Sequence, residues 1–184
     1  MRELHLSHEQ SRELVRISRS QMPKEACGLL LGVDNKVISV IAIPNTAPDP
    51  IHHFVLQPEA YLRALQQADT ENLQLLAIFH SHPTSRPIVS QEDIHDSRRS
   101  FPTMTHLLIS LVAHKPQLAA WHITADDVQS VELVLRGISR INNRDFELSQ
   151  TQVTAIVIAG VLAVLLFVII AVGLLPPPPP LPAG

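Results

Sequence analysis

The sequence predicts an α/β fold of mixed α+β character, in which helices flank a mixed sheet, followed by one C-terminal transmembrane helix. Two observations predict the sheet and its helices. Short apolar runs of strand length alternate with helical segments up to about residue 135, and two of the expected helices carry capping signals. The transmembrane helix follows from the charge distribution, because no charged side chain lies at or beyond Ser149.

Two helices are expected in the first half of the chain, after a short first strand. Ser7 and Gln10 have the spacing of a capping box, which predicts a helix over residues 9–20 with an apolar stripe. A second helix is expected over 58–70, where Pro58 suits a first helical position.

The remaining apolar runs predict strands. The first two form a hairpin, because Asp34-Asn35 between them is a favoured turn pair. The expected strands cover residues 28–32, 36–43, 73–79, 106–113, 118–124 and 130–135. This mixed order favours an α+β or α/β domain over a helical bundle, and no internal repeat is visible.

The most informative motif, His80-Ser81-His82-Pro83, directly follows one of these apolar runs. Residues i and i+2 of a strand point to the same face, so the two imidazoles can converge on one ion. Pro83 ends the strand, and residues 84–89 are expected to form a loop.

The third ligand is expected from the segment after that loop. Ser90 and Asp93 have the spacing of a capping box and predict a new helix. The loop returns the Asp93 carboxylate toward the strand end that carries His80 and His82. Three such ligands, with a fourth position left to water, are what a catalytic zinc ion needs. Each fragment alone is more often packing or a simple helix cap.

A hydrolytic zinc site also needs a carboxylate that takes a proton from the attacking water. Glu25 is the candidate, because it lies directly before the apolar strand 28–32. From the local sequence alone, an ordinary solvated acid is the simpler interpretation. Cys27 is the only cysteine, which excludes an intramolecular disulfide, and its apolar neighbours favour a buried small residue over a thiol nucleophile.

These residues together resemble the JAMM (MPN+) family of zinc metallopeptidases over roughly residues 4–135. The resemblance rests on Pro-x-Glu-Ala-Cys-Gly-Leu-Leu-Leu-Gly at 23–32, His-Ser-His-Pro at 80–83 and Ser-x-x-Asp at 90–93. The family often has proline directly before the serine, where this chain has Val89. The resemblance implies an MPN-type, cytidine-deaminase-like fold.

Carried over by position, the resemblance implies a function. His80, His82 and Asp93 would bind one zinc ion, Glu25 would activate the zinc-bound water, and Ser90 would steady the tetrahedral intermediate. Family members cleave peptide or isopeptide bonds after the C-terminal glycine of ubiquitin-like proteins, and bacterial relatives process sulfur-carrier proteins. A substrate of one of these two kinds is therefore the expected partner.

Two other classes stay open. A catalytically silent scaffold would bind a ubiquitin-like partner, although such relatives usually lack ligands that this chain has. A nucleobase deaminase would carry His-x-Glu and Pro-Cys-x-x-Cys, and this sequence contains neither. Nucleic-acid binding has no support, because the net charge is −3 and no basic cluster is present.

The C-terminal part predicts a membrane anchor. Residues 155–175 form an uninterrupted apolar run, which as a helix would be about 31 Å long, close to the thickness of the bilayer core. The expected organisation is a metallopeptidase domain at 1–148, a linker and transmembrane helix at 149–175, and a proline-rich tail at 176–184.

The orientation of this anchor follows from the flanking charges. Arg136, Arg140 and Arg144 precede the apolar run and no basic residue follows it, so the positive-inside rule predicts a tail-anchored protein with a cytoplasmic domain. The polar N-terminus shows no signal sequence, which agrees with this orientation. Alanines spaced four apart in the run, at 155, 159 and 163, offer a close helix face for a homodimer.

Overall fold

A computed structural model describes residues 2–136 of the chain. The elements in this part are β1 (Glu3–Ser7), α1 (His8–Gln21), β2 (Cys27–Val33), β3 (Lys36–Ile43), α2 (Pro58–Thr70), β4 (Gln74–His82), α3 (Gln91–Ser100), β5 (Met104–Ser110), β6 (Gln117–Ile123) and β7 (Val128–Arg136). The predicted alternation of strands and helices is confirmed, with ends that differ by a few residues.

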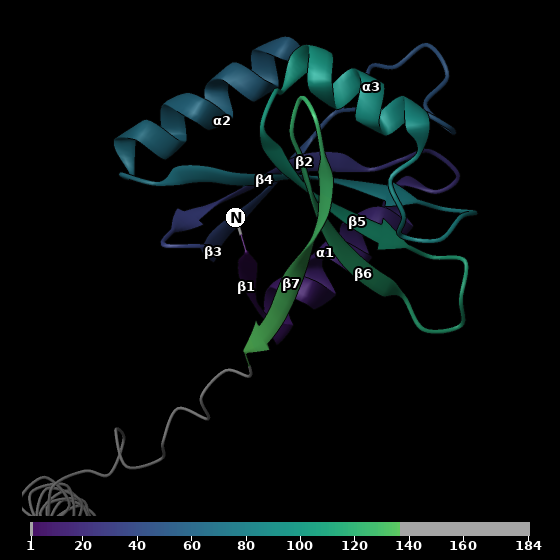
Figure 1. Cartoon of the computed structure of the whole chain (residues 1–184), viewed down its shortest axis with the longest axis horizontal. Coiled ribbons are helices and arrows are strands. Elements are labelled where there is room, and N and C mark those ends of the chain that lie inside the picture. Colours follow the sequence, from purple (N-terminus) through teal and green to yellow (C-terminus); the bar gives the residue numbers. More distant parts are fainter. Residues whose placement is uncertain (1, 137–184) are drawn as a thin grey trace, which may run out of the picture. The chain divides into compact units, whose positions relative to one another are not determined.

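The strands form a closed barrel in the order β1-β3-β2-β4-β5-β6-β7. The sheet is mixed, because β1 runs parallel to β3 and β7, and β4 runs parallel to β5, while the other neighbours are antiparallel. Figure 1 shows α2 and α3 on one side of the strands and α1 on the other. Closure was not predicted, since it depends on β1 joining the first and last parts of the domain.

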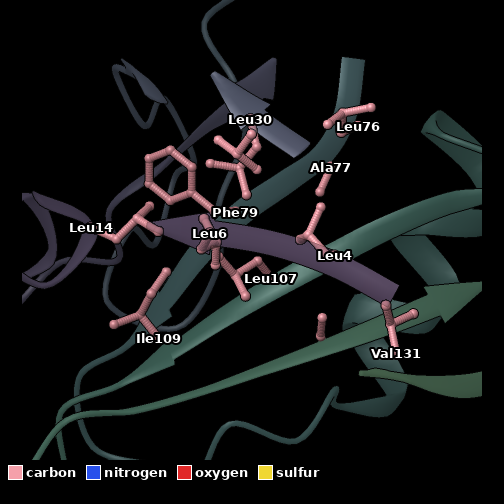
Figure 2. Packing of buried hydrophobic residues seen from close by; sticks show 12 residues of the cluster. Leu4, Leu6, Leu14, Leu30, Leu76, Ala77, Phe79, Leu107, Ile109 and Val131 are labelled. Atoms are coloured by element: carbon pink, nitrogen blue, oxygen red, sulfur yellow. The ribbon is translucent and has the colours of Figure 1, made fainter. Parts of the chain in front are cut away.

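Two apolar clusters hold this arrangement together. The first draws side chains from all seven strands of the described part and from Leu14 of α1, so it fills the barrel. Figure 2 shows Leu6 of β1 close to Phe79 of β4 and Leu107 of β5, and Leu4 further along β1, near Ala77. The second cluster lies under α2 and uses the opposite faces of β2 and β4. The central strands are therefore buried on both faces, which explains their uninterrupted apolar sequences.

The local signals predicted from the sequence are confirmed. Both capping boxes form, with Ser7 and Gln10 at the start of α1 and Ser90 and Asp93 at the start of α3. The β2–β3 hairpin turns at Asp34 and Asn35, whose φ angles are 49° and 63°. Left-handed backbone at both central residues is what a two-residue hairpin turn of this kind requires.

The predicted transmembrane helix at 155–175 lies outside the described residues, as do the linker and the proline-rich tail. Among residues 2–136, none of the helices combines the length and the apolar character needed to cross a bilayer. The anchor therefore stays a prediction from the sequence.

Gly28 tests the packing of the central strands. It pairs with Ala42 of β3 and with Phe79 of β4. A Cβ at this position would collide with the backbone oxygen of Ile41 and lie 2.6 Å from the Phe79 ring. We expect Gly28→Ala to lower the free energy of unfolding by about 1–3 kcal/mol, the usual cost of overpacking. Urea unfolding measures this, and Ser130→Ala on the exposed face of β7 is the control. Equal stability of the two variants would contradict the packing.

Candidate metal centre

The centre forms at the C-terminal end of β4. His80 and His82 lie on the face of β4 that also carries Ile78, the face turned toward α2. Their Nε2 atoms are 3.1 Å apart and both side chains are buried. The prediction that these two imidazoles converge is confirmed.

The start of α3 brings the third group to the same place. One carboxylate oxygen of Asp93 lies 3.4 Å from His80 Nε2, and the other lies 3.6 Å from His82 Nε2. The Ser90 amide donates to this carboxylate at 2.7 Å, and the Ser90 hydroxyl accepts from the Asp93 amide at 3.0 Å. The helix cap therefore orients the carboxylate toward the imidazoles.

The electrostatics of the three groups suit a cation. Burial would raise the pKa of Asp93, but the imidazoles of His80 and His82 outweigh it and hold that pKa well below its usual range. Burial lowers the pKa of His80, which keeps its imidazole neutral. For His82, the Asp93 carboxylate and the Arg86 carbonyl outweigh burial and raise the pKa.

These residues fit a zinc ion. Bonds of 2.0–2.1 Å at tetrahedral angles place neighbouring ligand atoms about 3.3–3.4 Å apart. The two imidazole nitrogens are 3.1 Å apart, and the nitrogen–oxygen separations of 3.4 and 3.6 Å, each to a different oxygen of Asp93, are close to that spacing. Two imidazole nitrogens and a carboxylate also match the ligand set of catalytic zinc ions, which leave one position free. Within the described residues, this is the group of side chains that could hold a metal ion.

The loop after β4 orients His82. Its Nδ1 lies 2.9 Å from the Arg86 carbonyl, which fixes the proton on Nδ1 and leaves Nε2 free to bind a metal. The neighbouring carbonyls are held as well. Ser110 of β5 donates to the Ser85 carbonyl at 2.6 Å, and Trp121 of β6 donates to the Pro87 carbonyl at 3.0 Å. Three strands thus hold three successive carbonyls of one loop.

Aromatic rings orient His80. The Phe54 ring stacks on its imidazole with centroids 4.4 Å apart, and His106 meets it edge-on at 6.2 Å. His106 is itself buried and accepts a hydrogen bond from Ser97 or donates one to it at 2.8 Å. Burial lowers the pKa of His106 to about 3, so this ring stays neutral beside the site.

Glu25 lies beside the same centre. Strand β2 pairs with β4 so that Cys27 faces His80, and Ser81 extends the pairing because its hydroxyl accepts from the Ala26 amide at 2.8 Å. Glu25, one residue earlier, is buried, and one of its carboxylate oxygens has no partner in the described part of the chain. Burial raises its pKa to about 7, with the His82 imidazole and the Asp93 carboxylate acting in opposite directions.

His80, His82 and Asp93 thus meet at one point, and Ser90 is bonded to Asp93. Glu25 lies close enough that the charges of His82 and Asp93 act on its pKa. Cys27 is buried, and burial raises the pKa of its thiol to about 12, as expected for an inert packing residue. His52 pairs with Asp49 at 2.9 Å on the exposed loop before α2. Asn45, which donates to the Glu25 carbonyl, is not predictable from the sequence, since a lone asparagine in a proline-rich loop carries no distinct signal.

Comparison with known families decides the classification. The family model for prokaryotic homologs of the JAB domain matches residues 7–133, a range that contains all five site residues. The chain belongs to this family. Its resemblance to JAMM proteins is thereby confirmed at the level of the JAB domain.

Solved structures agree with the fold of this JAB domain. A protein from Desulfitobacterium hafniense is 31% identical, and the match covers 76% of this chain and 97% of that one with a TM-score of 0.64. A protein from Salinibacter ruber shares the fold at 23% identity, with a TM-score of 0.51 over 74% of this chain and 92% of that one.

Two relatives carry the names of enzymes. A desampylase from Pyrococcus furiosus is 34% identical over 112 residues, which are 60% of this chain and 76% of that protein. A probable TtuB-protein conjugate cleaving protease from Thermus thermophilus is 40% identical over 82 residues, 45% of this chain and 55% of that protein.

The raised pKa of Glu25 predicts a pH-dependent cost in the metal-free JAB domain. In the unfolded chain the Glu25 carboxyl has a pKa of 4.5, whereas in the folded domain its pKa is about 7. Its contribution to the free energy of unfolding is therefore highest below pH 4.5 and is lost as pH rises through about 7. That shift corresponds to about 3 kcal/mol. We therefore expect Glu25→Gln to gain about that much stability over the wild type between pH 4.5 and pH 8.

Urea unfolding in the presence of a chelator, followed by the fluorescence of the single Trp121, measures this difference. Glu59→Gln, on the exposed first turn of α2, is the matched control and should show no pH-dependent gain. A difference between Glu25→Gln and the wild type that stays constant with pH would contradict the burial of the Glu25 charge.

Proposed function

We propose that this JAB-domain protein is a zinc-dependent hydrolase of the JAMM type, which cleaves peptide or isopeptide bonds after the C-terminal glycine of ubiquitin-like or sulfur-carrier proteins. The observation that carries the proposal is the combination of three candidate ligands at zinc spacing with the buried carboxylate of Glu25, one oxygen of which has no partner among the described residues. The relatives named for desampylation and for cleavage of TtuB-protein conjugates support it.

The residues have distinct roles in this proposal. His80, His82 and Asp93 would hold the zinc, which when bound polarises a carbonyl and makes water more acidic. Glu25, with a pKa of about 7, accepts a proton from the attacking water and returns it to the departing amine. The Ser90 hydroxyl keeps its hydrogen free while accepting from the Asp93 amide, so it can donate to the carbonyl oxygen as that oxygen gains negative charge.

The non-catalytic scaffold is the alternative. A scaffold needs no buried acid, yet the ionised form of Glu25 is costly to keep in the folded protein, as its raised pKa shows. Such a cost at an otherwise apolar strand end favours a catalytic role for Glu25.

The proposal predicts separate outcomes for the base and for a ligand. Glu25→Gln should keep one zinc per chain and lose about 10²–10⁴-fold in turnover, because it removes the proton acceptor and no ligand. Asp93→Ala should lose both zinc and activity. The measurements are zinc content by elemental analysis and cleavage of a conjugate joined through the terminal glycine of a ubiquitin-like protein.

Asp93→Ala also removes one of the two hydrogen bonds of the capping box of α3, the one that its carboxylate accepts from the Ser90 amide. Asp96→Ala on the same helix controls for the loss of an acidic side chain and should keep both zinc and activity. Unchanged turnover in Glu25→Gln would exclude its role as the base. Full zinc content in Asp93→Ala would exclude the ligand set, and a wild type that binds zinc without cleaving any conjugate would favour the scaffold.

We further propose that residues 155–175 anchor the protein in a membrane, with the domain on the cytoplasmic side. The support is the apolar run without charge, preceded by Arg140 and Arg144. The full chain should stay with the membrane fraction after alkaline carbonate washing, whereas residues 1–148 should be released. Protease added outside intact cells should leave the domain uncut, and its digestion would contradict the orientation.

A further inference from the structure

We propose that Asn45 is a positioning residue, which sets the place of Glu25 relative to His80. It bonds the backbone of Glu25 and also the loop whose Phe54 ring packs on His80. This inference rests on the proposed function, because it assigns Asn45 a part in catalysis through Glu25. Asn45 lies in the loop between β3 and α2, directly after Pro44, and is half-buried.

The Asn45 side chain uses its whole hydrogen-bonding capacity. Its Nδ2 donates to the Glu25 carbonyl at 3.0 Å and to the His53 carbonyl at 2.9 Å. Its Oδ1 accepts from the amides of Ala47 and Val55, both at 3.0 Å. A primary amide has two donor hydrogens and two acceptor sites, so all four are engaged with backbone groups.

One of these four bonds joins two segments that are distant in the sequence, and the other three lie within one of them. One segment is the short connection between α1 and β2, which carries Glu25. The other is the loop 45–56, which also accepts a hydrogen bond from the Glu25 amide at the Pro50 carbonyl, 2.7 Å away. Both backbone groups of Glu25 are therefore bound to this loop, and Asn45 supplies one of the two bonds.

The same loop reaches the metal centre on its other side. Phe54 lies between His53 and Val55, two of the four residues that the Asn45 side chain binds, and its ring stacks on His80 at 4.4 Å. Asn45 thus connects the backbone of the proposed base to the ring that packs on a proposed ligand. An error of about 1 Å in such a placement can cost 10²-fold in rate.

The donor and acceptor halves of the amide can be tested separately. Asn45→Asp keeps an oxygen that accepts from Ala47 and Val55 but removes both donors, and it places a negative charge against the Glu25 and His53 carbonyls. Asn45→Ala removes all four bonds. Asn72→Asp is the matched control, because Asn72 lies at the exposed end of α2 with a φ of 54° that Asp tolerates.

The first experiment measures steady-state cleavage of a glycine-linked conjugate and zinc content in the full chain. We expect Asn45→Asp to lower kcat about 10–100-fold, to change KM less than twofold and to keep one zinc per chain. In a Glu25→Gln background, the same substitution should change the residual rate less than twofold, because its effect passes through Glu25. Asn72→Asp should match the wild type.

The second experiment is independent of turnover. Amide hydrogen exchange of the metal-free chain should be faster for Glu25 in Asn45→Asp, while the amides of Ala47 and Val55 stay protected. In Asn45→Ala, all three amides should exchange faster than in the wild type.

The outcomes are distinct. An equal loss of rate in the wild-type and Glu25→Gln backgrounds would overturn the positioning role, because it would show a general structural effect. An unchanged kcat together with faster exchange at Glu25 would also overturn it. If the wild type cleaves no conjugate, the proposed function fails, and hydrogen exchange alone tests whether Asn45 holds Glu25 in place. Faster exchange of the Glu25 amide in Asn45→Asp then supports this positioning, and unchanged exchange overturns it.

Discussion

The antiparallel pairing of β2 with β4 is the interaction on which the metal centre depends. It places Cys27 opposite His80, and the hydroxyl of Ser81 extends the pairing to Ala26. Glu25 lies directly before Ala26 in the chain, so backbone hydrogen bonds bring this acid toward the imidazoles. Because both strands are buried on both faces, a shift by one residue would exchange the contents of two apolar clusters. The hydrophobic core therefore fixes the register of the site.

A second constraint is the double use of Asp93. Its carboxylate accepts the Ser90 amide as part of a helix cap and also faces two imidazoles. A helix N-terminus favours a negative charge, and so does a metal ion, so the two roles reinforce each other. The fold thus stabilises the ionised form of the Asp93 carboxylate, which agrees with its low pKa.

Glu25 shows the opposite balance. Its carboxyl is buried, one of its oxygens has no partner within residues 2–136, and its ionised form is disfavoured near neutral pH. Local instability of this kind is typical of sites where function, and not stability, determines the residue. The loop that contains Asn45 and Pro50 nevertheless holds Glu25 in place, because it binds both the amide and the carbonyl of Glu25.

The sequence by itself determined the local elements and the candidate ligands His80, His82 and Asp93. Capping boxes, the hairpin turn and the alternation of His80 and His82 depend on neighbouring residues, so their signals are short-range and legible. The apolar segment 155–175 is equally local in origin, and it stays a prediction because it lies outside the described residues.

Only the tertiary structure decided the closure of the barrel and the surroundings of the site. Closure needs β1 to pair with β7. The loop whose Arg86 carbonyl is bonded to His82 is also held by Trp121 of β6, at the Pro87 carbonyl. The place of Glu25 depends on Asn45, twenty residues away. Such contacts join residues that are distant in the chain, and their energy depends on packing and geometry that no single segment encodes.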